Sequence, residues 1–220
     1  MALRRRHKRT EQSKIDATPP WDVRQRDEPD PTTGPYDERD APDDEVARVD
    51  LGALHVPVRP GIEMRLDMNE AQQVIAVTLT NRDSQMQLGV FAAPRNEGIW
   101  EEVRAEIRES LVSQRGSAKE REGGPFGTEL IGTLRSEGGT SPVRFLGVDG
   151  PRWFVRAMVL GPAANEPARA KVFEEAFRNT VVVRGREPLP VRDPVPLQLP
   201  KEAAAQLEEA QQAADADAAE

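Results

Sequence analysis

Residues 145–161 have the sequence FLGVDGPRWFVRAMVLG, a pattern typical of a β-hairpin. Two apolar runs, Val143–Val148 and Trp153–Leu160, flank the turn composition Asp149-Gly150-Pro151-Arg152. The second run is apolar on both faces, and only Arg156 interrupts it. A strand that is apolar on both faces must be covered on both sides. The hairpin is therefore predicted to supply the central strand of a sheet.

Shorter apolar or alternating segments precede the hairpin, and turn residues separate them. The predicted strands are Leu51–Val58, Glu63–Met68, Val74–Thr80, Met86–Ala92 and Thr128–Leu134. Short connections favour antiparallel neighbours. The glycine-rich stretch at residues 123–127 matches no phosphate-binding motif and precedes a strand, so a turn or bulge that seats Phe126 is predicted there.

Two helices are predicted between and after the strands. In Ile99–Arg115 apolar residues recur at four-residue steps while acidic and basic residues fill the opposite face. The second helix begins near Asn165-Glu166-Pro167 and gives way to a short strand at Val181–Val183. Runs of strands with helices between them predict an α+β domain, an antiparallel β-sheet with two main helices packed on it.

Composition divides the chain into four parts. Residues 1–45 are rich in Pro, Asp and Arg and are predicted to be a disordered tail with a basic head, in which Trp21 and Tyr36 are candidate docking anchors. Residues 46–185 form the single folded domain. Residues 186–200 carry a proline about every third position and are predicted to lie extended along the domain. Residues 201–220 are predicted to be a disordered or transiently helical acidic tail.

Charge and cysteine content limit the possible partners. The net charge of −8 disfavours nucleic acid and anionic membranes, although the basic head offers Arg4, Arg5, Arg6, Lys8 and Arg9 for weak nucleic-acid contact. No apolar stretch is long enough for a transmembrane helix, and no apolar segment follows the basic head as in a signal peptide. The chain has no cysteine, which fits a reducing cytoplasm, and a cytoplasmic location is expected.

Several long strings resemble an actinobacterial family catalogued as a domain of unknown function, number 3710. They are DxGxLHVPV from Asp50, VFAAPR from Val90, IWEEVRAEI from Ile99, RFLGVDGPRWFVRA from Arg144 and NTVVVRGREPLPVRDPVPLQLP from Asn179. The resemblance covers about residues 37–200 and implies no activity, ligand or catalytic residue. The element order is also similar to the Mog1/PsbP-type α-β-α sandwich, an analogy of fold that implies partner binding.

Groups for catalysis or metal binding are scarce. His55 is the one histidine outside the tail, and the sequence has neither a GxSxG nor an HExxH motif. Paired acids for hydrolysis would have to come from Asp67, Glu129 or Asp149, and no spacing selects them. We therefore predict no catalytic residue, no metal site and no cofactor.

Arginine is the most informative polar residue of the central hairpin. Arg144, Arg152 and Arg156 surround it, and alternation predicts that Arg156 is buried. A buried guanidinium needs a partner, because an unpaired one costs several kcal/mol. These arginines, with Trp153 as a stacking face, form a speculative site for a carboxylate or phosphate ligand. The alternative for Arg156 is an internal salt bridge to a helix glutamate.

The sequence thus favours a non-catalytic binding or interaction protein whose partner is another protein, with the tails contributing contacts. A sensor or enzyme that acts on an anionic small molecule, such as a nucleotide, at the arginine-flanked hairpin is the alternative. Attachment to nucleic acid through the basic head is a third possibility, which the acidic remainder of the chain disfavours.

Overall fold

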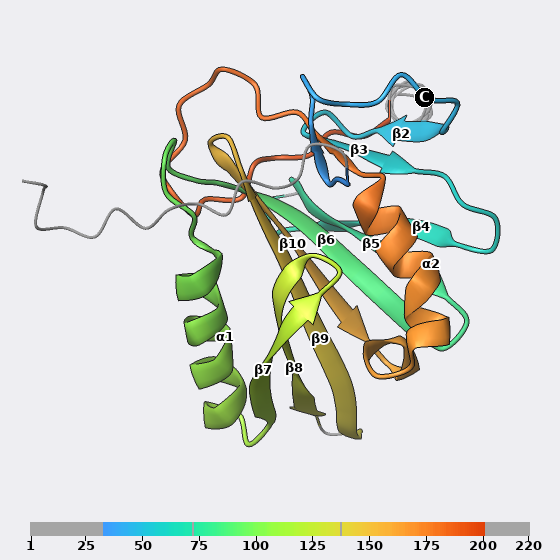
Figure 1. Cartoon of the computed structure of the whole chain (residues 1–220), viewed down its shortest axis with the longest axis vertical. Coiled ribbons are helices and arrows are strands. Elements are labelled where there is room, and N and C mark those ends of the chain that lie inside the picture. Colours follow the sequence, from blue (N-terminus) through green and yellow to red (C-terminus); the bar gives the residue numbers. More distant parts are fainter. Residues whose placement is uncertain (1–32, 72, 137, 201–220) are drawn as a thin grey trace, which may run out of the picture.

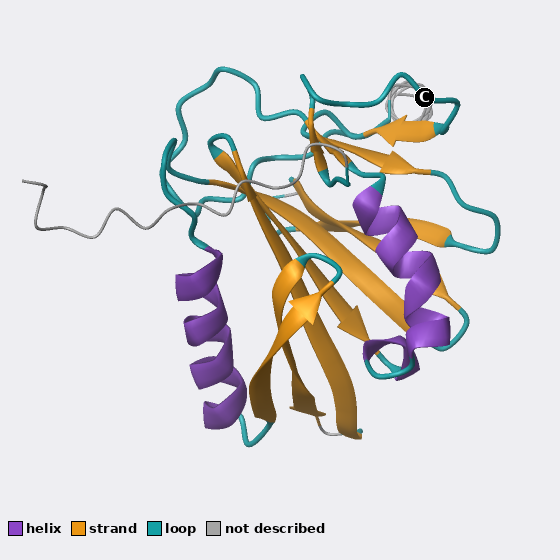
Figure 2. Ribbon diagram, in the orientation of Figure 1, coloured by secondary structure: helices purple, strands orange, loops and turns teal. Residues whose placement is uncertain are grey.

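The computed structural model of the chain describes residues 33–71, 73–136 and 138–200. Helices α1 (Trp100–Ser113) and α2 (Pro167–Arg178) lie on opposite sides of an antiparallel sheet (Figure 1). Figure 2 shows the sheet as the layer between them. A short 3₁₀ helix, η2 (Pro162–Ala164), leads into α2. The predicted fold class, α+β with two main helices packed on an antiparallel sheet, is confirmed.

The described residues build a large sheet of seven strands in the order β4-β5-β6-β10-β9-β8-β7. These strands are β4 (Glu63–Met68), β5 (Val74–Asn81), β6 (Ser84–Ala92), β7 (Ser117–Gly124), β8 (Gly127–Ser136), β9 (Gly139–Gly150) and β10 (Trp153–Leu160). Every neighbouring pair is antiparallel. The predicted hairpin is β9–β10, and β10 is the middle strand.

A smaller sheet has the order β1-β11-β3-β2 within the part of the chain that the structure describes. Its strands are β1 (Tyr36–Asp37), β2 (Arg48–Asp50), β3 (Leu54–Pro57) and β11 (Val181–Val182). The prediction of one strand over Leu51–Val58 is wrong, because the chain turns at Gly52. That residue has a φ of 75° and donates its N–H to Asp50 Oδ1 at 2.8 Å, so β2 and β3 form a hairpin.

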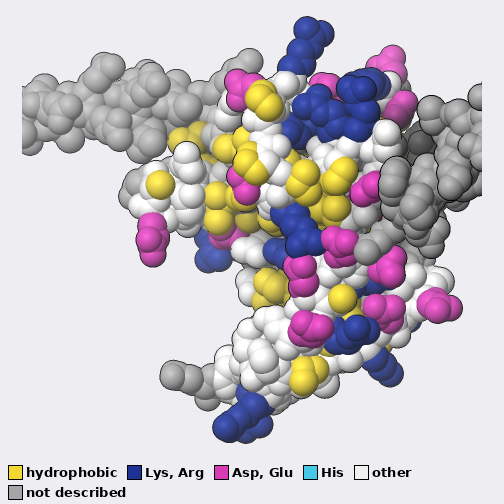
Figure 3. All heavy atoms as spheres, turned by 90° about the vertical axis from the view of Figure 1, so that its left-hand side faces the viewer, with side chains coloured by type: hydrophobic (Ala, Val, Ile, Leu, Met, Phe, Trp, Pro, Cys, Tyr) yellow, Lys and Arg dark blue, Asp and Glu magenta, His cyan; other side chains and the backbone are white. Residues whose placement is uncertain are grey.

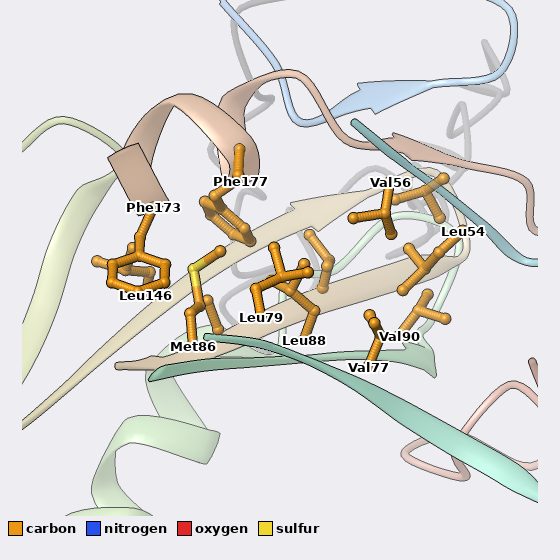
Figure 4. Packing of buried hydrophobic residues seen from close by; sticks show 14 of the residues in the cluster. Leu54, Val56, Val77, Leu79, Met86, Leu88, Val90, Leu146, Phe173 and Phe177 are labelled. Atoms are coloured by element: carbon orange, nitrogen blue, oxygen red, sulfur yellow. The ribbon is translucent and has the colours of Figure 1, made fainter. Parts of the chain in front are cut away.

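Alternate side chains of β10 enter two separate cores. Trp153, Val155, Ala157 and Val159 belong to the larger core, which α2 and the small sheet cover. In Figure 4, Phe173 and Phe177 of α2 point toward the strands, and Leu54 and Val56 of β3 lie at the other end of the same cluster. On the opposite face Phe154 packs in a second core beneath α1, with Trp100 and Leu111 from that helix.

The chain ahead of residue 46 contributes to the fold, although residues 1–45 were expected to be a tail. Tyr36 and Asp37 pair in parallel with β11, and Asp37 is buried. Asp37 Oδ2 accepts a hydrogen bond of 2.8 Å from the indole Nε1 of Trp153. This bond satisfies both buried polar groups, which explains why an acidic residue can be fixed against the core. Residues 1–32, with Trp21, and the predicted tail at 201–220 lie outside the described residues.

The proline-rich segment (residues 186–200) lies extended between two strands that diverge. β5 and β6 pair only from Val77↔Leu88 to Asn81↔Ser84. Beyond that point, Val195 donates its N–H to Val90 O of β6 at 2.9 Å, and Leu197 donates to Val74 O of β5 at 2.8 Å. The segment thus satisfies backbone groups of both strands. Its residues Val195 and Leu197 are buried in the larger core.

Two valines of this segment provide a matched test of that packing. Val195 is 6% exposed and Val191 is 50% exposed. Val195→Ala should lower the free energy of unfolding by about 1.5–3 kcal/mol, because it removes buried methyl groups and leaves a cavity. Val191→Ala should change it by less than about 0.5 kcal/mol. Urea denaturation followed by circular dichroism measures both, and equal effects would contradict the packing described.

Candidate functional site

The four residues singled out in the sequence do not meet at one place. Arg144 lies on the β9 face that α2 covers, and Trp153 lies on the same face of β10 at the opposite end of the hairpin. Arg152 occupies the turn between the two strands. Arg156 lies on the face that α1 covers, beside Phe154. The fold therefore does not bring these four residues together in one site.

Arg144 is fully engaged inside the protein. Its Nη2 lies 2.8 Å from Glu129 Oε1, and its Nη1 lies 2.6 Å from Glu174 Oε1 on α2. Arg121 also bonds to Glu129, so two arginines and two glutamates neutralise one another. Burial alone would lower the pKa of Arg144, but the two carboxylates outweigh it and raise the pKa above its usual value. Arg144 is a structural residue, paired with a helix glutamate.

Trp153 and Arg152 also serve the fold. The Trp153 indole is completely buried and is bonded to Asp37, so it offers no stacking face to a ligand. Arg152 has a φ of 65°, and its carbonyl oxygen accepts hydrogen bonds from Arg184 Nε and Ala93 N. Burial, together with the charge of Arg152, lowers the pKa of Arg184. Arg152 of the turn and Arg184, which follows β11, are therefore neighbouring cations.

Arg156 differs from Arg144 because no carboxylate contacts it among the described residues. Its guanidinium carbon lies 5.1 Å from the centre of the Phe91 ring, a cation–π contact. Burial lowers the pKa of Arg156 below its usual value, and nothing opposes that shift. An arginine stays charged even so. The site therefore holds a partly desolvated positive charge.

Two glycines make the room around Arg156. Arg156 lies opposite Gly89 on β6 and opposite Gly147 on β9. A Cβ at Gly147 would lie 2.4 Å from the Trp100 ring, and one at Gly89 would lie 3.3 Å from the Phe91 ring. Aromatic rings thus occupy the space beside Arg156 that two cross-strand side chains would otherwise fill.

A pocket of about 160 Å³ lies at Arg156, between α1 and the sheet. Its walls are the apolar side chains of Phe91, Ile99, Val103 and Phe154, with Arg156, Glu106 and Arg192 as the polar groups. Arg192 of the proline-rich segment forms ion pairs with Glu102 at 2.5 Å and Glu106 at 2.6 Å. On this side of the molecule, Figure 3 shows apolar side chains gathered above interspersed acidic and basic ones.

The candidate acids and His55 are used separately. Asp149 accepts the backbone N–H groups of Ile99 and Trp100 at 2.9 and 3.2 Å, and so caps α1 from the hairpin. Asp67 accepts bonds from Thr78 and Gln87. His55 Nε2 lies 3.2 Å from Asp50 at a half-exposed position. Within residues 33–71, 73–136 and 138–200, no three His, Asp or Glu side chains are grouped so that they could hold a metal ion.

A second pocket, of about 220 Å³, lies between the β5–β6 turn and α2. Its cation Arg169 contacts both carboxylate oxygens of Asp83 at 2.7 Å. Arg169 lowers the pKa of Asp83 through this bond. Because Arg169 is already paired with a carboxylate, it is less available to an incoming anion than Arg156, which contacts no carboxylate among the described residues.

Sequence reasoning identified Arg156 but missed its surroundings. Phe91 and Arg192, which come from segments far apart in the sequence, were not expected to lie beside it. One signal was available: the tripeptide Leu-Gly-Val occurs at residues 88–90 and again at 146–148. Both glycines lie opposite Arg156 in the sheet.

Comparisons with known proteins identify a family and one similar fold. A family model described as "Protein of unknown function (DUF3710)" matches residues 34–206. No curated protein matches the sequence. Among solved structures, the chain is similar to the "Solution Structure of Cyanobacterial PsbP (CyanoP) from Synechocystis sp. PCC 6803", with 10% sequence identity and a TM-score of 0.41 over 64% of this chain and 96% of that chain. Among the described residues, no helix has the length and apolar character needed to span a membrane.

The structural role of Arg144 can be tested against an exposed arginine. Arg144→Met should lower the free energy of unfolding by about 3 kcal/mol or more, because it leaves the buried Glu129 with only Arg121 as a charged partner. Arg169→Met, which removes two ion pairs at the surface, with Asp83 and Glu166, should leave the urea midpoint almost unchanged. Full stability of the Arg144 variant would show that its buried pairs are dispensable.

Proposed function

We propose that this chain, which belongs to the DUF3710 family of proteins of unknown function, works by binding rather than by catalysis. Its partner is a protein that presents an acidic side chain next to an apolar one. The acidic group enters the pocket at Arg156, and the apolar neighbour packs against Phe91, Ile99 and Phe154. Specificity comes from one charge-assisted hydrogen bond in an otherwise apolar setting.

The observation that carries this proposal is the state of Arg156. It is partly buried, it contacts an aromatic ring, and it has no carboxylate partner among the described residues. A cation that burial has partly stripped of water gains more from an incoming anion than an exposed one does. Arg144 on the neighbouring strand β9 has two carboxylate partners, so the two arginines differ in how their charge is compensated.

The size of the pocket favours a side chain over a complete metabolite. Pockets for drug-sized ligands and cofactors enclose about 300–1,000 Å³. The pocket at Arg156 encloses about 160 Å³, which accommodates a carboxylate and a few apolar atoms but not a nucleotide. An anchor side chain from a larger partner needs no more room, because the remaining contacts lie on the surrounding surface.

The surface around the pocket fits such a partner. Val191 is half exposed on the proline-rich segment, and Pro188, Pro190 and Pro194 are exposed beside it. Apolar residues at the rim can pack against a chain whose acidic group is held below them. The absence of cysteine supports a cytoplasmic setting, and an actinobacterial origin is part of the same proposal.

Binding can be tested with a displayed library of short random peptides panned against the full chain. The enriched peptides should carry Asp or Glu beside an apolar residue. Arg156→Met should weaken their binding by about tenfold or more, because a hydrogen bond to a charged group is lost. Fluorescence anisotropy with a labelled enriched peptide measures the change.

A matched control separates this site from general electrostatic attraction. Arg135→Met removes an exposed arginine on β8 and should leave the affinity within about twofold, since surface charges contribute little. Replacing the acidic residue of the peptide by its amide should reproduce the loss seen with Arg156→Met. Enrichment of basic or purely polar peptides, or equal loss in both variants, would rule out the proposed site.

A further inference from the structure

Strand β4 forms one edge of the large sheet, and its outer side is open. No described residue outside β5 shares a backbone hydrogen bond with residues 63–68. An edge strand presents unpaired N–H and C=O groups and can pair with another strand. The register shift next to Asp67 and Met68 places the extra residue on β5, because these consecutive residues pair with Ala76 and Val74, so β4 itself carries no inserted residue.

The side chains of β4 alternate between charge and apolar character. Glu63, Arg65 and Asp67 lie on one face, and Met64, Leu66 and Met68 lie on the other. Arg65 is 76% exposed and Met68 is 51% exposed. Met64 and Leu66 lie at the rim of the larger core and are only partly covered. The strand therefore offers both an apolar and a charged face to a neighbour.

We propose that β4 pairs antiparallel with β4 of a second copy of this chain, about a two-fold axis at Leu66. In that register Leu66 faces Leu66 of the second copy, and Met64 faces Met68. On the charged face Arg65 lies opposite Asp67 of the second copy, and the symmetry makes this pair twice. Arg65 Nε is also 3.5 Å from Oδ1 of Asp67 in its own chain, so each Arg65 would lie near two aspartates. Opposite charges and apolar side chains directly across two strands stabilise their pairing.

At the opposite edge of the sheet, the same two-fold symmetry would bring like charges of β7 together. Strand β7 carries the consecutive charged residues Lys119, Glu120, Arg121 and Glu122. A two-fold register centred on any of these residues places that residue opposite its own copy, so like charges meet. Like charges directly opposite are destabilising, and charged edges prevent pairing. Registers centred on the charged part of β7 are therefore disfavoured, whereas the register centred on Leu66 of β4 places opposite charges across from one another.

A two-fold axis perpendicular to the sheet keeps both copies facing the same way. The two large sheets become one continuous sheet, and the two α1 helices lie on the same side of it. The pocket at Arg156 lies on β10, three strands away from β4, so dimer formation is independent of the proposed binding function. Because the paired strands are short, the dimer is expected to be weak and to depend on concentration.

Sedimentation equilibrium of the full chain tests the proposal. The wild-type chain should show a monomer–dimer equilibrium. Arg65→Glu should weaken it at least tenfold, because both symmetry-related pairs change from attraction to repulsion. Arg135→Glu makes the same charge change at an exposed position of β8, and should leave the dimerisation constant within about twofold.

A mixing experiment tests the register itself. Arg65→Glu and Asp67→Lys should each be impaired as a homodimer, whereas their mixture restores both opposite-charge pairs and should form a heterodimer. Asp67 also accepts bonds from Thr78 and Gln87, so circular dichroism must first show that Asp67→Lys is folded. If Asp67→Lys is not folded, the comparison of Arg65→Glu with Arg135→Glu tests the proposed pairing. A wild-type chain that stays monomeric at about 1 mM, or equal effects of those two variants, would overturn the proposal.

Discussion

The burial of β10 on both faces is the constraint on which the other elements depend. A strand of this kind is stable only when separate layers exclude water from each side. One layer is α1, and the other consists of α2 with the small sheet. Two rings fix how closely these layers approach, since Trp153 lies over Gly150 and Trp100 lies over Gly147. Both helices are thus positioned by a single hairpin.

The two arginines on this hairpin show how the layer that covers a strand decides whether a buried charge is paired. Arg144 and Arg156 are on neighbouring strands, yet they face opposite layers. The layer above Arg144 supplies Glu174, whereas the layer above Arg156 supplies aromatic rings. A desolvated charge without a counter-ion lowers the free energy of unfolding. Proteins keep such a charge where the binding of a partner compensates for the lost stability.

Both helices and most strands of the large sheet could be predicted from the sequence because periodicity and turn residues are local signals. Strand β7 was not predicted, since its run of charged residues lacks the apolar alternation of a strand. The turn at Gly52 was missed, since the apolar residues on both sides of it have the pattern of one continuous strand. The surroundings of Arg156 were missed for another reason. Phe91 and Arg192 reach it through pairing between strands and through the proline-rich segment, and no local pattern encodes either approach.

The position of the proline-rich segment also constrains how the protein can be made. Its residues Val195 and Leu197 bond to strands from the first half of the domain, so these contacts have a very large separation in sequence. During synthesis on the ribosome, β5 and β6 emerge long before the segment that fills the gap between them. Contacts of this kind form late and slow folding. The nascent chain must therefore keep a partly open sheet until nearly all of the domain has left the ribosomal tunnel.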